Sequence, residues 1–504
     1  MALIAAGVLG WGIYHYAYDH FAQAAGDQKP SKPVNINDVL KATVTALTLI
    51  GAVLAGLYAY RKQLLAEGDA HRADASQLAE RYTTAAEQLG HDQAAVRLAG
   101  VYALARLADD WVEQRQVCID VLCAYLRMPY EPDPAATGHK EGEREVRQTI
   151  IRVIRDHLQQ PDALTAWCQH NFDFTGAVFD GGNFSNSHFR GTVVFADAEF
   201  SAGTVSFGGA AFSGGTIRFN DAVFSGGTVL FGGAAFRGGT VDFGGAAFSG
   251  GTVLFSDAAF SAGTVDFAFA AFSGGRVLFN DVAFSGGRVD FGRADFSGGI
   301  VSFGGADFSG GVVVFGGATF SGGAVDFGAA EFSGGTVHLV GAEFSGGMVH
   351  FGRAAFSGGT VHFVNATFSG GTVDFGNARL SGGTVHFGGA AFCGGTVLFG
   401  GAAFNGGRVT FGNATFSGGT FAFLEATFSG GTITFIGATF SGGSVDFGGA
   451  EFSGGSVDFG RATFSGGAVT FERATLTGGR VTFDNPTFSG TVFDWGPLPV
   501  PAGA

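Results

Sequence analysis

The pattern of hydrophobic positions changes near residue 172, after which one short repeat continues almost to the end of the chain. From Phe207 to Phe488, Phe recurs at alternating steps of five and seven residues, so the unit is twelve residues long. A small apolar residue precedes each Phe by two positions, as in VDF at 241–243 and AAF at 246–248. A spacing of two puts both side chains on one face of an extended segment. The pattern therefore predicts very short strands with two inward residues each.

The Phe residues form two ranks, one in V-x-F and one in A-x-F. Only Leu339, Leu380 and Leu476 replace Phe in either rank. Steps of five and seven do not keep residues on one stripe of a helix. We therefore expect stacked aromatic ladders inside a β-solenoid. The first ten positions of these ladders are Phe207, Phe212, Phe219, Phe224, Phe231, Phe236, Phe243, Phe248, Phe255 and Phe260.

The connectors between the short strands are rich in Gly. Two residues connect the strands within each step of five, as in GG at 244–245, and four within each step of seven, as in RGGT at 237–240. Gly adopts backbone angles that other residues resist. We therefore expect both connectors to be corners that need this conformational freedom.

One coil could consist of a single twelve-residue unit with two faces, or of two units with four faces. The interior of a single-unit coil would have to enclose two Phe, one Val and one Ala, which is too much volume. His338, His350 and His362 recur once per unit and favour the smaller coil. We favour the two-unit coil, because outward Leu and Asp residues alternate from unit to unit: Leu230, Asp242, Leu254, Asp266, Leu278 and Asp290.

The start of the array, FTGAVFDGGNFSNSHF at 174–189, has steps of five only and resembles the pentapeptide-repeat family. Ala177 and Ser187 occupy the small-residue positions of that pattern, and Gly182 departs from it. The resemblance implies a mainly β fold, a right-handed, quadrilateral parallel β-helix. The segment RYTTAAEQLGHDQAAVRLAGVYALARLA at 81–108 is similar to actinobacterial, membrane-anchored members. That similarity implies transmembrane helices and a small α-helical region before the solenoid.

The chain before the repeat has two parts. Residues 1–62 predict a membrane anchor, with an apolar span at 39–60 and a second, weaker candidate at 2–18. At ~1.5 Å per residue, 39–60 can cross a hydrocarbon core of ~30 Å. Residues 63–170 show helical periodicity and predict an α-helical capping region. We expect the solenoid at 172–494 and a C-terminal cap and tail at 495–504, where Trp495 covers the last Phe.

Positive charges give little information about orientation, since they flank the 39–60 span on both sides. Arg61 and Lys62 directly follow the span, which favours a cell-membrane protein with a cytoplasmic solenoid. From residue 172 onward the net charge is −11, out of −15 for the chain. Such a surface is not expected to bind nucleic acid directly. The four Cys residues have no metal-ligand or disulfide spacing.

The sequence contains no recognisable catalytic, cofactor or metal motif. Three surface sets remain: an Arg set on the helix before the array, a His strip, and a set of outward Thr residues. As functional sites, the Arg set would be an anion-docking face, the His strip a pH-sensitive or metal strip, and the Thr set a flat surface for ice-like water or another sheet. We favour a structural explanation for each: a solvated helix face for the Arg set, drift within a duplicated repeat for the His strip, and ordinary β-propensity for the Thr set. The three sets are Arg144, Arg147, Arg152 and Arg155; His338, His350, His362 and His386; and Thr415, Thr427, Thr439, Thr463, Thr475 and Thr487.

Two functions follow from these features. The first is a non-enzymatic, membrane-anchored scaffold that presents a rigid acidic β-solenoid to an unknown protein partner. The alternative comes from the family resemblance, since some pentapeptide-repeat proteins mimic duplex DNA and modulate a topoisomerase such as gyrase. An enzyme is not expected.

Overall fold

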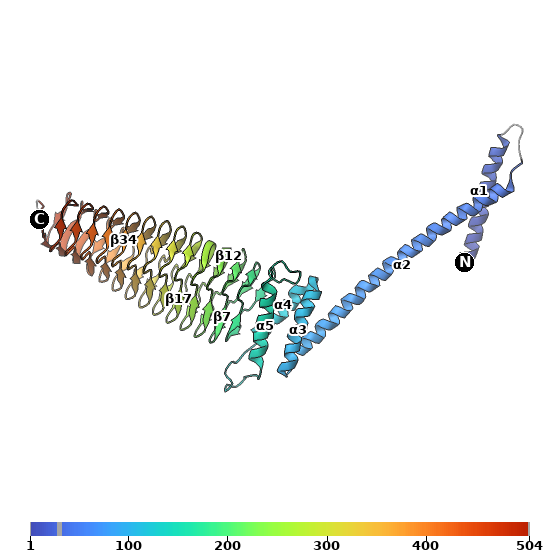
Figure 1. Ribbon diagram of the computed structural model, residues 1–504, viewed down its shortest axis with the longest axis horizontal. Helices are drawn as coiled ribbons and strands as arrows, with labels where there is room; N and C mark the ends of the chain where they lie inside the picture. Colours follow the sequence, from blue (N-terminus) through green and yellow to red (C-terminus); the bar gives the residue numbers. More distant parts are fainter. Residues whose placement is uncertain (1, 28–32, 502–504) are drawn as a thin grey trace. The chain divides into compact units, whose positions relative to one another are not determined.

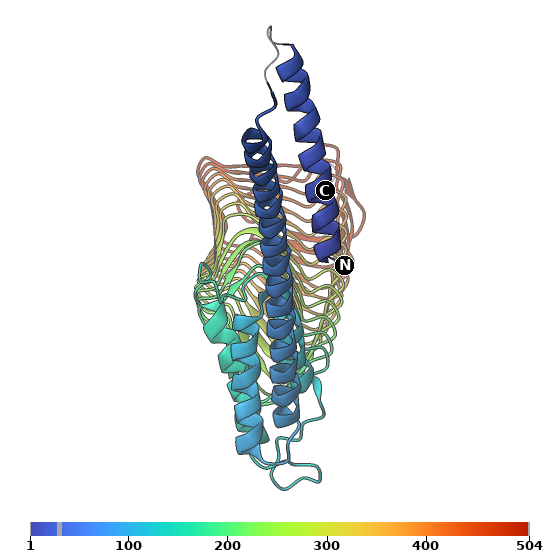
Figure 2. The same ribbon diagram turned by 90° about the vertical axis from the view of Figure 1, so that its right-hand side faces the viewer.

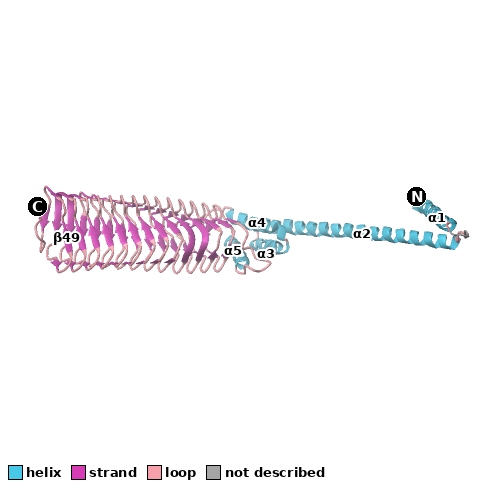
Figure 3. Cartoon of the chain, turned by 90° about the horizontal axis from the view of Figure 1, so that it is seen from above, coloured by secondary structure: helices cyan, strands magenta, loops and turns pink. Residues whose placement is uncertain are grey.

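The computed structural model describes residues 2–27 and 33–501, and the chain divides into two units between Thr83 and Thr84. The helices are α1 (Ala2–Gly26), α2 (Ile36–Leu89), α3 (Ala94–Asp110), the short 3-10 helix η1 (Val112–Gln114), α4 (Arg115–Arg127) and α5 (Glu143–Leu158) (Figure 1). All strands follow α5 (Figure 3).

The first unit consists of α1 and most of α2. Within the described residues, one helical segment, Ile36–Ala66, is long and apolar enough to cross a membrane. Its side chains are largely exposed, for example Val53 (62%) and Leu54 (60%). α1, which contains the weaker predicted span at 2–18, does not meet the same criterion.

The repeat forms a parallel β-solenoid of about 13 turns, as the sequence predicted. Its strands run from β1 (Phe172–Asp173) to β51 (Val492–Asp494) and lie one behind another along the coil (Figures 1 and 2). A typical coil contains four short strands, for example β16 (Ala271–Phe272), β17 (Arg276–Leu278), β18 (Ala283–Phe284) and β19 (Arg288–Asp290). The strands of every coil belong to two sheets of 25 and 26 strands, called here the first and the second sheet. β18 and β19 lie in the first sheet, and β16 and β17 lie in the second.

The register settles the size of the coil. Val229 pairs with Val253 and Phe236 with Phe260, so equivalent residues are two units apart and the single-unit coil is wrong. The first coil is shorter, because Phe179 already pairs with Phe200, whereas the next partner of Phe200 is Phe224. The coil reaches its full length of two units as the longer connectors enter the sequence.

The two-residue connectors are tight turns that take the chain from one sheet to the other. In one of them, the N–H of Ala222 donates to the carbonyl of Phe219 (3.1 Å) and Asp221 has a φ of 58°. A positive φ at the third residue is typical of a type II turn. Gly, Asn and Asp fill most of these positions, in agreement with the predicted need for conformational freedom.

The four-residue connectors correct that prediction, because most of them keep the chain within one sheet without a positive φ. Gly250 and Gly251 both lie outside the left-handed region, yet a Cβ on Gly251 would be 2.9 Å from the carbonyl oxygen of Gly227. The N–H groups of Ser249, Gly250 and Gly251 all donate to the carbonyl of Phe224, at 3.1–3.3 Å. These Gly residues therefore permit close contact between successive coils.

The interior consists of four ladders of Phe rings. Along one ladder, Phe219 and Phe243 stack with centroids 4.7 Å apart and planes 5° apart. Across the coil, Phe219 meets Phe231 edge to face at 6.1 Å and 87°. Both are favoured aromatic geometries, and burying each ring contributes roughly 1.5–3 kcal/mol.

The N-terminal end of the ladders is covered, and the C-terminal end is covered in part. Gly182 departs from the small-residue pattern because Ile151 of α5 packs there: a Cβ on Gly182 would be 2.9 Å from Ile151 Cδ1. At the other end, Trp495 stacks on Phe493 at 4.3 Å and meets Phe483 edge to face at 5.3 Å. Trp495 thus contacts the last Phe residues, as predicted, whereas Leu476 at the end of another ladder is 38% exposed. The end of the predicted tail, 502–504, lies outside the described residues.

The connector geometry predicts that Gly359→Ala destabilises the solenoid. The new Cβ would lie 2.8 Å from the oxygen of Gly335 and 2.9 Å from Cβ of Phe332, which forces successive coils apart. We expect a loss of about 1–3 kcal/mol, typical of overpacking, in urea unfolding of the full chain followed by circular dichroism. Gly388→Ala is the matched control, since its nearest atom is 3.7 Å away. Equal midpoints for the two variants would contradict the close-contact explanation.

Candidate functional site

In the described part of the chain, no group of three or more His, Cys, Asp or Glu residues is placed to hold a metal ion. Cys118, Cys123 and Cys168 are buried, Cys393 is exposed, and all four are free thiols. Burial raises the pKa of Cys118 to about 11, which leaves it protonated and unreactive.

The outward positions of V-x-F form one surface column on each sheet. In the first sheet three Asp residues are followed by Val314 and then by His residues; in the second, three Leu residues are followed by Ser302 and by an Asp-His-Asp group. The predicted alternation of Leu and Asp thus places them on different faces. In the first column Asp242, Asp266 and Asp290 follow Arg218, and in the second Leu230, Leu254 and Leu278 follow Ser206.

The Asp column is engaged with the backbone of its own turns. Asp242 Oδ1 accepts a hydrogen bond from the N–H of Gly244, and Asp290 Oδ1 from that of Gly292, both at 2.8 Å. Burial, with smaller contributions from Asp290 and Asp242, raises the pKa of Asp266. These carboxylates close the turns that follow them, so their first role is structural.

The four candidate His residues divide between the two sheets, as the two-unit coil predicts. His338, His362 and His386 stack in the first sheet, with ring centroids 4.9 and 5.1 Å apart. His350 lies in the second sheet, with Nδ1 2.9 Å from Asp326 and Nε2 3.7 Å from Asp374. The strip therefore contains three His residues, and His350 belongs to a separate acidic setting.

Burial lowers the pKa of all three stacked His residues. His362 has the most symmetrical setting, because His338 and His386 both lower its pKa further. His386 Nδ1 lies 2.8 Å from the hydroxyl of Thr410, the next residue of the column. The stack is therefore favoured in its neutral form.

The outward Thr residues of A-x-F also divide between the sheets. Thr415, Thr439, Thr463 and Thr487 follow one another in the second sheet. Thr427 and Thr475 lie in the first sheet with Glu451 between them. Among the outward A-x-F positions of the described coils, an uninterrupted run of four Thr residues occurs only in the second sheet.

The four Arg residues of α5 have two different roles. Arg152 and Arg155 pair with Glu145 (3.6 Å) and Asp156 (2.6 Å) on the solvated face, as predicted. Arg144 instead contacts Asp180 of the first coil at 2.8 Å. The fourth, Arg147, is buried and donates to the carbonyls of Leu126 and Val178. This half of the set joins the helices to the solenoid, a role that the sequence pattern does not reveal.

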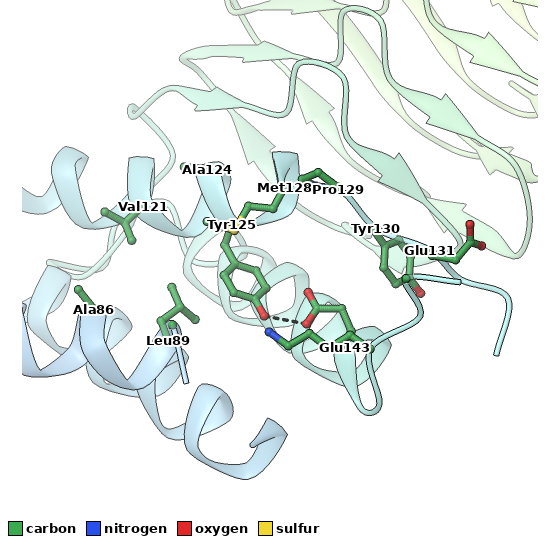
Figure 4. A pocket seen from close by; sticks show the side chains of 13 residues that line it. Ala86, Leu89, Val121, Ala124, Tyr125, Met128, Pro129, Tyr130, Glu131 and Glu143 are labelled. Carbon is green, nitrogen blue, oxygen red and sulfur yellow. Dashed lines mark hydrogen bonds between the residues drawn. The ribbon is translucent and has the colours of Figure 1, made fainter. Parts of the chain in front are cut away.

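The helical region contains a cavity of about 490 Å³ that the sequence did not reveal (Figure 4). Apolar side chains from two segments form much of its wall: Ala86 and Leu89 at the end of α2, and Val121, Ala124 and Met128 at α4 and its C-terminal end. The loop 129–140 and the start of α5 complete it with Pro129, Tyr130, Glu131, Gly138, Lys140 and Glu143.

One wall of the cavity is a buried polar group. The carboxylate of Glu143 accepts a hydrogen bond from the Tyr125 hydroxyl at 2.8 Å (Figure 4) and lies 3.4 Å from Arg97. Arg97 is fully buried and Glu143 is 7% exposed. Burial raises the pKa of Tyr125, and the hydrogen bond to Glu143 raises it further, so the hydroxyl keeps its proton.

Comparison with known proteins identifies one part of the chain. Residues 174–217 match a family model described as pentapeptide repeats (9 copies). This stretch includes the five-residue steps that begin the array. No curated protein and no solved structure matches the chain.

The His stack predicts acid sensitivity in its own coils. The pKa values of the stacked His residues in the folded state lie below the ordinary value of 6.5. The folded stack therefore binds fewer protons than the unfolded chain. Stability is consequently lost as the pH falls from about 6.5 through the folded-state pKa values. We expect hydrogen exchange of the strands at 336–386, normalised to intrinsic rates, to accelerate between pH 7.5 and 5.5. His362→Thr should reduce this acceleration, since Thr occupies the same column at Thr410 and Thr434.

The coils after Thr410 contain no His and provide the internal reference. An acid response in the variant as large as in the wild type would show that the stack is not its source.

Proposed function

Because this pentapeptide-repeat protein carries a β-solenoid, we propose that it is a non-enzymatic, membrane-anchored scaffold whose solenoid binds a protein partner. The observation that carries the proposal is the contrast between interior and surface. The interior repeats the same buried rings at almost every coil, whereas the outward column of each sheet changes its chemistry along the axis. Such a surface offers different stretches to a partner without any change in the framework.

The helix Ile36–Ala66 supports the membrane part of the proposal, since it is apolar, long enough to span, and largely exposed. Its C-terminal flank, Arg61 and Lys62, favours a cytoplasmic solenoid. A rod attached to a membrane by such a helix would hold its partner near that surface.

DNA mimicry remains the alternative proposal, and the charge of the solenoid is its support. The acidic column Asp242, Asp266 and Asp290 is limited to three coils and gives way to Val314 and the His stack. Duplex DNA carries a charge every ~1.7 Å along its whole axis, so a surface of this kind favours a protein partner. Inhibition of gyrase supercoiling by micromolar full-length protein would reverse this preference.

Deletions of whole coils test the scaffold. Removing 243–314 joins Asp242 to Phe315, and removing 327–398 joins Asp326 to Phe399; each removes three coils and keeps the register and both ends. We expect quantitative pull-downs from membranes to lose a given partner with one deletion and keep it with the other, because the two stretches differ in surface chemistry.

Each deletion serves as the control for the other, since both shorten the rod by about 14 Å at ~4.8 Å per coil. Recovery of the same partners with both would show that these parts of the rod are not the binding element.

The orientation has a separate test. A protease-cleavable tag placed after residue 504 should be protected from added protease in intact cells and cleaved after lysis. Cleavage in intact cells would place the solenoid outside and change the set of available partners.

A further inference from the structure

The cavity in the helical region has the size of a small-molecule site. Its volume of about 490 Å³ lies within the range of ligand pockets. Leu89, Val121 and Ala124 provide apolar surface, and Tyr125 and Tyr130 add two rings (Figure 4). The described cavity belongs wholly to the second unit of the chain, so its geometry does not depend on the placement of the membrane anchor.

The two rings are held in place by the hydrogen bonds of their hydroxyl groups and by one guanidinium. The hydroxyl of Tyr125 donates to Glu143, and that of Tyr130 donates to Asp180 of the first coil, each at 2.8 Å. The guanidinium of Arg147 lies 4.4 Å from the centre of the Tyr130 ring. A ligand would therefore meet preformed walls, which reduces the entropic cost of binding.

Glu143 leaves one acceptor available to a ligand. The hydrogen bond from Tyr125 and the ion pair with Arg97 both use Oε2. Oε1 is not among the fully buried side-chain atoms that lack a partner, so it is accessible to a donor in the cavity. A carboxylate oxygen can accept two hydrogen bonds. The cavity is thus complementary to a group that donates a hydrogen bond to Oε1.

The charges around the cavity select against ions. Arg97 already balances Glu143, and the two other charged residues of the wall, Lys140 and Glu131, have opposite signs. An anionic ligand would face the carboxylate of Glu143, and a cation would add an unbalanced charge beside Arg97. A neutral donor, such as a hydroxyl, satisfies Oε1 without either penalty.

We propose that this cavity binds a neutral small molecule with an apolar, ring-sized body and one hydrogen-bond donor that reaches Glu143 Oε1. The site lies in the helical region and is independent of the proposed scaffold role of the solenoid. A ligand seated there contacts Tyr130, whose hydroxyl is bonded to the first coil at Asp180.

A matched set of probes tests both parts of the proposal: 2-naphthol, its methyl ether, 2-naphthoate and 2-naphthylmethylammonium. The full chain is placed in nanodiscs, and binding is measured by saturation-transfer NMR with empty nanodiscs as the blank. We expect 2-naphthol to bind at least tenfold more tightly than the ether, which has no donor, and than either ion.

Ala124→Leu should abolish this binding because it fills the cavity, while Ala99→Leu, at an exposed position of α3, should not. Met128→Glu provides a second variant at a 55% exposed lining position, where folding tolerates a change, and should weaken 2-naphthol several-fold.

Three results would overturn the proposal. They are no binding of any neutral probe at millimolar concentration, equal binding of 2-naphthol and its ether, or unchanged binding in both Ala124→Leu and Met128→Glu. The first removes the site, the second removes the role of Glu143, and the third places the probe elsewhere.

Discussion

The close stacking of successive coils is the constraint on which the solenoid depends. Phe rings in one ladder are about 4.7 Å apart, and this spacing brings the connectors equally close. A side chain on the second Gly of a connector, such as Gly251, would collide with the backbone of the preceding coil. The short spacing between successive coils therefore explains both the high Phe content and the high Gly content of the chain. Aromatic stacking favours the short spacing, and the absent Cβ allows it.

Much of this fold could be predicted from local patterns. The small apolar residue two positions before each Phe indicates which face of the strand points inward. The alternation of Leu230 and Asp242 with their equivalents identifies the size of the coil. The role of the connector Gly residues could not be predicted, because a sequence does not distinguish a positive φ from a close contact. Gly182 shows the same limit: its reason is Ile151, which lies on another element.

The cavity was beyond prediction for a related reason. Its walls come from the end of α2, from α4, from a loop and from α5, and no spacing in the sequence joins them. The buried pair of Arg97 and Glu143 is far apart in the sequence and would read as two solvated charges on helices. Arg147 is similar, since its helix looks amphipathic while the side chain itself is buried against the first coil. Features that repeat along the chain can be predicted from the sequence, whereas contacts that occur only once cannot.

One coil contains two repeat units, and this relation affects how the outward surface of the solenoid can evolve. Each unit supplies half a coil, so neighbouring units place their outward residues on different sheets, as His338 and His350 do. Gain or loss of a single unit would leave the aromatic interior intact. Beyond that point, however, each outward column would move to the opposite sheet. The Leu and Asp positions would exchange sheets, and so would the His stack and the Asp-His-Asp group. One small duplication could thus turn the whole distal surface around in a single event, with no cost to the core.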